Sequence, residues 1–88
     1  MQDLNLQQLI FPVKWHYKII TDANTENILD DINRILSEHG VTHQAQSGNF
    51  SSNRKYLTYK VTVEFFCREE MERLSLALRN ISGVKYLI

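Results

Sequence analysis

The sequence has few of the residues that mark specialised classes of protein. Among its 88 residues are one cysteine, one proline and three glycines, and its ten basic and ten acidic side chains cancel. A single cysteine, Cys67, forms no internal disulfide, so the pattern of disulfide-stapled secreted domains is excluded. Zero net charge disfavours a dedicated nucleic-acid-binding protein, because such proteins usually carry a strong basic excess.

Long apolar runs are missing as well. No stretch approaches the roughly 20 apolar residues that a membrane-spanning helix needs, and Asp3 stands where a secretory signal peptide would be basic. We therefore expect a cytoplasmic protein with no membrane partner. The chain length corresponds to one small domain, residues 10–88, preceded by a polar and flexible N-terminal arm, residues 1–9.

What is present is regular patterning of apolar residues. Residues 13–21 and 56–66 alternate between apolar and polar types, which predicts two strands with one buried face each. Residues 41–46 and 84–88 predict two shorter strands, with a turn-forming stretch at 47–55. Two apolar stripes at helical spacing predict helices between the strands; their members are Ile28, Ile32, Ile35 and Leu36 in the first and Met71, Leu74, Leu78 and Ile81 in the second.

This order of elements predicts an α+β fold. Two helices with one apolar stripe each must cover the same face of a sheet, and right-handed crossovers then lead to a ferredoxin-like βαββαβ sandwich. The predicted sheet has four antiparallel strands in the order 4-1-3-2. The first and third strands, which have the strongest strand patterns, are central.

The face of this sheet opposite the helices is the candidate interaction face. If Trp15, Tyr17 and Ile19 point into the core, the alternation predicts six polar or aromatic candidates on the other face: Lys14, His16, Lys18, Tyr56, Thr58 and Lys60. One interpretation is an ordinary solvated face of an antiparallel sheet. The other is a docking face for a protein, a second copy of the chain, or RNA. RNA is the weakest of these, because Tyr56 is the only aromatic predicted there for stacking bases.

No motif for catalysis or metal binding is found in the sequence. His39 and His43 are four residues apart, but Gly40 ends the predicted helix between them, so they do not share a helical face. Cys67 stands at a predicted helix start, where a dipole lowers a thiol pKa, yet Glu69 and Glu70 oppose that effect. We expect no catalytic residue, no metal and no cofactor, and therefore no enzyme.

The chain resembles the YbeD-like family of small bacterial proteins. The resemblance rests on Phe11-Pro12, Tyr17-Lys18-Ile19, Ser51-Ser52 and the ending Val84-Lys85-Tyr86-Leu87-Ile88. It implies the same βαββαβ fold, a likeness to ACT regulatory domains, and no enzymatic activity. An ACT-like small-molecule site would lie in the loop after the first strand, at Asp22, Asn24 and Thr25.

Three functions follow from these observations. The first is a non-enzymatic regulatory or protein-interaction module, which can also form a homodimer by pairing edge strand 41–46 or 84–88 with a second copy. The second is an ACT-like small-molecule sensor that uses the loop named above. The third is an RNA-binding domain that uses the lysines and Tyr56 of the candidate face.

Overall fold

The computed structural model describes residues 9–88, so residues 1–8 of the predicted arm lie outside the described part. The elements are β1 (Val13–Asp22), α2 (Ile28–Glu38), β2 (Gln46–Phe50), β3 (Tyr56–Phe65), α3 (Arg68–Arg79) and β4 (Val84–Leu87). Their order is the predicted one. No helix within residues 9–88 is long and apolar enough to cross a membrane.

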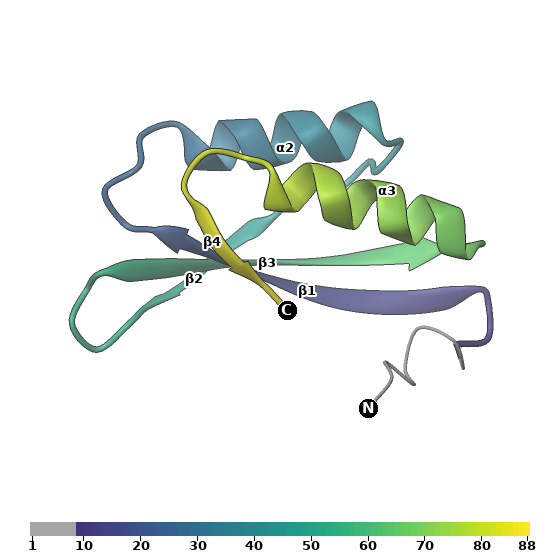
Figure 1. The fold of residues 1–88 in the computed structure, drawn as a ribbon, viewed down its shortest axis with the longest axis horizontal. Helices are drawn as coiled ribbons and strands as arrows, with labels where there is room; N and C mark the ends of the chain where they lie inside the picture. Colours follow the sequence, from purple (N-terminus) through teal and green to yellow (C-terminus); the bar gives the residue numbers. More distant parts are fainter. Residues whose placement is uncertain (1–8) are drawn as a thin grey trace.

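The molecule has two layers (Figure 1). Both helices lie on one face of the sheet, and no helix or strand of residues 9–88 covers the other face. The strands lie in the order β2-β3-β1-β4, with every neighbouring pair antiparallel. This is the predicted order read from the opposite edge, and it confirms the ferredoxin-like fold.

The core lies between the sheet and the helices, as the alternation predicts. Tyr17 and Ile19 of β1 are buried, and the ring of Tyr17 meets Phe65 of β3 edge-on at 6.2 Å between centroids. Trp15, also predicted to be core, is only partly buried. The helices contribute their predicted stripes, except that Ile35 is partly exposed and Ile81 lies just after the end of α3; the buried members are Ile28, Ile32, Leu36, Met71, Leu74, Leu78 and Ile81.

The prediction of a strand at 41–46 is wrong, because the strand is β2, at Gln46–Phe50. Residues 41–45 bond to α2 instead: the Val41 amide donates to the carbonyl of Leu36, and the Ala45 amide to the side chain of Asn33. The hairpin turn is therefore shorter than the predicted stretch 47–55. It is closed by the Ser51 amide, which donates to the Tyr56 carbonyl at 2.9 Å.

The helix starts also differ in detail from the usual capping patterns. Helix α2 follows Asn27, whose backbone is left-handed and whose side chain makes no capping bond. At α3 the Cys67 side chain makes no cap bond either. Instead the Glu70 carboxylate accepts a hydrogen bond from the Phe66 amide at 3.2 Å, which satisfies a donor just before the helix.

Candidate functional site

The residues predicted for the candidate interaction face do lie together. In the β1–β3 register Lys14 is opposite Glu64, His16 opposite Thr62, and Lys18 opposite Lys60. Side chains alternate along each strand, so these pairs share the face that the helices leave uncovered. We call this surface the open face; it also includes Ile20, Tyr56 and Thr58 of the same strands and, from β4, Tyr86 and Ile88.

The backbone hydrogen bonds show how closely the two central lysines approach. Lys18 exchanges both backbone bonds with Ile88, at 3.0 Å each, so its N–H and C=O point toward β4 and away from β3. Lys18 and Lys60 are therefore a non-hydrogen-bonded pair, the type in which Cα atoms are about 4.5 Å apart and side chains are nearest. Like charges directly opposite one another destabilise a sheet.

Lys18 and Lys60 have no acidic residue opposite them, whereas Lys14 is opposite Glu64. Within residues 9–88, no carboxylate lies within 4.0 Å of the ammonium group of Lys14, Lys18 or Lys60, although Glu64 is on the same face. His16 is different, because its Nδ1 lies 2.8 Å from the hydroxyl of Thr62 and shares a hydrogen bond with it. Lys18 and Lys60 are thus the unmatched charges of this surface.

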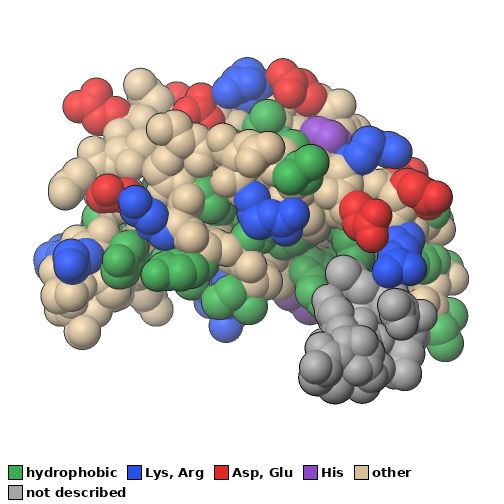
Figure 2. All heavy atoms as spheres, in the orientation of Figure 1, with side chains coloured by type: hydrophobic (Ala, Val, Ile, Leu, Met, Phe, Trp, Pro, Cys, Tyr) green, Lys and Arg blue, Asp and Glu red, His purple; other side chains and the backbone are tan. Residues whose placement is uncertain are grey.

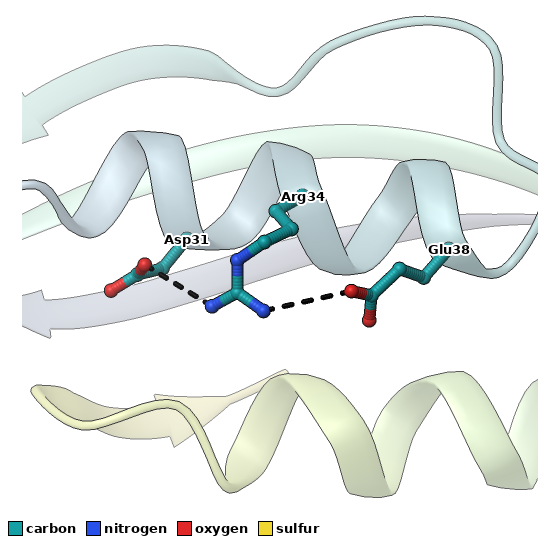
Figure 3. Close-up of polar contacts among 3 residues, drawn as sticks. All are labelled: Asp31, Arg34 and Glu38. Carbon is teal, nitrogen blue, oxygen red and sulfur yellow. Dashed lines mark hydrogen bonds and ion pairs between the residues drawn. The ribbon is translucent and has the colours of Figure 1, made fainter.

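Several charges of the helix layer, by contrast, form ion pairs (Figure 3). On α2, Arg34 lies between Asp31 at 3.2 Å and Glu38 at 3.7 Å, and on α3 Arg68 meets Glu72 at 3.1 Å. Acidic and basic side chains consequently stand side by side over the helices (Figure 2). Such exposed pairs contribute little to stability, about 0.2–1 kcal/mol each.

Neutral net charge therefore hides an asymmetry between the layers. The strands β1, β3 and β4 carry four lysines against two acids, a net charge of +2. The two helices carry six acids against four arginines, a net charge of −2. A surface with one sign of charge attracts partners of the other sign and speeds their association.

One end of the open face is apolar, which the sequence reasoning missed. Tyr86 is 59% exposed and Ile88 63% exposed, and they lie next to Ile20 and Lys18 of β1. The rings of Tyr56 and Tyr86 meet at an angle of 69°, with 6.3 Å between centroids. The alternation in VKYLI already puts Tyr86 and Ile88 on the same side of their strand. Only the register of β4 with β1 shows that this side belongs to the open face.

The candidate ligand loop is held by internal hydrogen bonds. The amide of Asn24 donates to the Asp22 carboxylate at 3.0 Å, and that of Thr25 to the Asp22 carbonyl at 3.1 Å. The Asp22 amide bonds to Gly83, while the side chain of Thr25 lies directly against the same glycine. With these donors already in use, few backbone groups remain for the carboxylate of an amino-acid ligand.

The candidates for metal and thiol chemistry are scattered. His43 bonds through Nε2 to the backbone carbonyl of Thr62, and His39 is exposed at the end of α2. Cys67 is partly buried and in its free form. Among residues 9–88, no three His, Cys, Asp or Glu side chains are grouped so that they could hold a metal ion.

Comparison with known proteins places the chain in a family. The model of the family described as "Protein of unknown function (DUF493)" matches residues 7–88. The chain belongs to this family. It is 31% identical over 91 residues to a UPF0250 protein of Shewanella woodyi, and 27% identical over 89 residues to one of Shewanella loihica; both alignments cover each chain completely. These relatives confirm the resemblance to the YbeD-like proteins.

The fold of the DUF493 chain is also found in a solved structure. The solution structure of the H. pylori protein HP0495 is similar with a TM-score of 0.72, over 92% of this chain and 86% of that one. The sequence identity is 18%, so the likeness concerns the fold alone. The family description assigns no activity or role, and the open face has to be interpreted from its own chemistry.

Proposed function

We propose that this protein is a non-enzymatic, cytoplasmic interaction module that binds an acidic protein partner through the open face. The observation that carries the proposal is the directly opposed pair Lys18 and Lys60, which has no acidic partner within residues 9–88. A sheet normally avoids such a pair. A carboxylate of the partner placed between the two ammonium groups would replace their repulsion by attraction. Binding is therefore favoured by the relief of a repulsion that is present in the free protein.

The apolar end of the open face supports a protein rather than a nucleic acid. Ile20 and Ile88 offer aliphatic contact area beside Tyr86, and tyrosines beside apolar side chains are typical of protein interfaces. Tyr56 and Tyr86 meet edge to face, an arrangement that provides no pair of parallel rings for stacked bases.

Capture from a native extract tests the proposal. The wild-type chain and the variant Lys18→Glu/Lys60→Glu are immobilised, and Arg79→Glu on the last turn of α3 serves as a control that also reverses a basic charge. We expect an acidic protein that is retained by the wild-type and Arg79→Glu chains, released by salt, and lost with the double variant. Nuclease treatment should leave retention unchanged. Retention by the double variant, or loss after nuclease treatment, would contradict the proposal.

We also propose that β2 forms a homodimer by pairing with β2 of a second copy. Strand β2 lies at an edge of the sheet, and its sequence QSGNF contains neither the charge nor the proline that protects exposed edges. The other edge, β4, carries Lys85 and is better protected. This pairing would leave the open faces of both copies accessible.

Light scattering over a concentration series tests the dimer. We expect the apparent mass to double as concentration rises, and Asn49→Pro, which introduces proline into β2, to abolish the doubling. Lys85→Pro in β4 is the matched control and should still dimerise if it folds, which circular dichroism establishes. A wild-type chain that stays monomeric up to about 1 mM, a concentration at which even weak complexes form, would contradict the dimer.

A further inference from the structure

A second surface lies where β2 ends and leaves the outer edge of β3 unpaired. Strand β2 pairs with β3 only at Tyr59, Lys60 and Leu57. The remainder of β3, from Thr62 to Phe65, has a strand neighbour only on its β1 side among the described residues. Because residues 41–45 of the predicted strand form a loop, nothing in residues 9–88 continues the ladder there.

The direction of the backbone groups on this edge follows from the ladder. Lys60 points its backbone groups away from β1, and backbone direction alternates along a strand, so Thr62 and Glu64 also point theirs outward. The Thr62 carbonyl confirms this direction, because it accepts a hydrogen bond from His43. The Thr62 N–H and both backbone groups of Glu64 have no partner within residues 9–88.

A cleft runs along this unpaired edge. It has a volume of about 740 Å³ and lies between the loop after α2, the end of β3 and the start of α3. Its apolar lining includes the core residues Val63, Phe65 and Leu74. Its charged lining side chains include two carboxylates, those of Glu38 and Glu70, and one guanidinium, that of Arg73, whereas the side chain of Glu64 points to the open face.

We infer that this cleft binds an extended, basic segment of a partner protein by strand addition to β3. Unpaired, outward-pointing N–H and C=O groups are the main-chain requirement for strand addition, and alternate side chains of the added strand supply specificity. One side of the added strand would place an apolar residue toward Leu74 and Phe65. The excess of carboxylates selects lysine or arginine at flanking positions. His43 lines the cleft and is already bonded to the Thr62 carbonyl, so that carbonyl is not available to the added strand.

This surface is separate from the open face and selects the opposite charge. The open face is basic and requires side-chain contacts, whereas the β3 cleft is acidic and requires backbone pairing. Because the two surfaces use different groups, a negative result for binding at one of them does not contradict binding at the other.

Amide chemical-shift mapping with designed peptides tests the inference. The probe is a pool of capped heptapeptides in which lysine alternates with valine, isoleucine, threonine or tyrosine. We expect the amides of Thr62 and Glu64 to shift and to become protected from hydrogen exchange. N-methylation of the peptide amides on its β3-facing edge should weaken binding about tenfold or more, since each lost bond amounts to about 1 kcal/mol.

Charge variants provide the second arm. Glu38→Gln/Glu70→Gln should weaken binding about threefold to tenfold, and the amide introduced at position 70 keeps an oxygen that can accept from the Phe66 N–H. Glu69→Gln is the matched control on the same helix and should bind as the wild type does. The inference is overturned if no peptide of the pool binds at about 1 mM, if the shifts fall away from β3, or if N-methylated peptides bind equally well.

Discussion

At the scale of single residues, Tyr17 is a titratable side chain buried in the core. It is 2% exposed, and its hydroxyl shares a 2.6 Å hydrogen bond with Ser75 of α3. Burial raises the pKa of this phenol above its ordinary value of 10.0, while the Ser75 bond and the charge of Arg79 partly oppose the rise. The bond therefore ties the central strand to the helix layer.

The raised pKa of Tyr17 gives a prediction for alkaline pH. Between its unfolded and folded pKa values the unfolded chain has released the proton and the folded chain has kept it, so stability falls as pH rises above about 10. Tyr17→Phe should remove this contribution and lower the free energy of unfolding at neutral pH by about 1 kcal/mol. Denaturant unfolding across pH measures both. Ser75→Ala is the control, because it breaks the bond but leaves the phenol to titrate.

The opposed lysines give a second prediction at this scale. Lys60→Glu places a carboxylate opposite Lys18 and should raise the free energy of unfolding by about 0.5–1 kcal/mol, while Lys60→Gln, which only removes the repulsion, should give a smaller gain. Denaturant unfolding measures both, and both effects should shrink in high salt. If Lys60→Glu were no more stable than the wild type, the two ammonium groups would not be in conflict.

The faces of β1 and β3 could be predicted from the sequence because alternation with period two depends on local patterning alone. Tyr17 and Ile19 therefore lie in the core as expected, and Lys14, Lys18 and Lys60 lie on the other face of the sheet. The exposed pair Tyr86 and Ile88 could not be placed in the same way. Their side depends on the register with β1, which long-range backbone bonds determine.

At the scale of elements, β2 shows how tertiary contacts override a weak strand pattern. VTHQAQ has more strand-forming residues than QSGNF, yet the second segment pairs with β3. Asn33 and Leu36 of α2 hold residues 41–45 by hydrogen bonds, and the turn at 51–55 sets which residues face β3. Local patterning does not reveal these contacts, so neither the position of β2 nor its register with β3 could be predicted from the sequence.

Gly48 permits the close approach of β2 to β3. A Cβ atom at this position would lie 2.8 Å from the backbone oxygen of Thr58. Gly48→Ala should therefore push β2 away and lower the free energy of unfolding by about 1–3 kcal/mol. Asn49→Ala, on the same strand, should change it by less than about 0.5 kcal/mol. Thermal unfolding of the two variants checks this; equal stabilities would mean that β2 tolerates a side chain at position 48.

At the scale of the whole molecule, the two layers have different electrostatic character. The helix layer has a net charge of −2 and contains ion pairs such as Arg34 with Asp31, whereas the lysines of the open face form no ion pair within residues 9–88. The fold explains why the helices cover one face only, but it does not require lysine opposite lysine on the other. Under the proposed function, the lysine pair is explained by binding of an acidic partner and not by folding.

The most direct test of the open face as a binding surface is the amide spectrum of the isotope-labelled chain in a native extract. At low salt we expect signals of β1, β3 and β4 to broaden, centred on Lys18, Lys60 and Tyr86, and to recover when salt is raised. The spectrum of the helix layer should change much less. Unchanged spectra, or broadening centred on α2 and α3, would contradict the account.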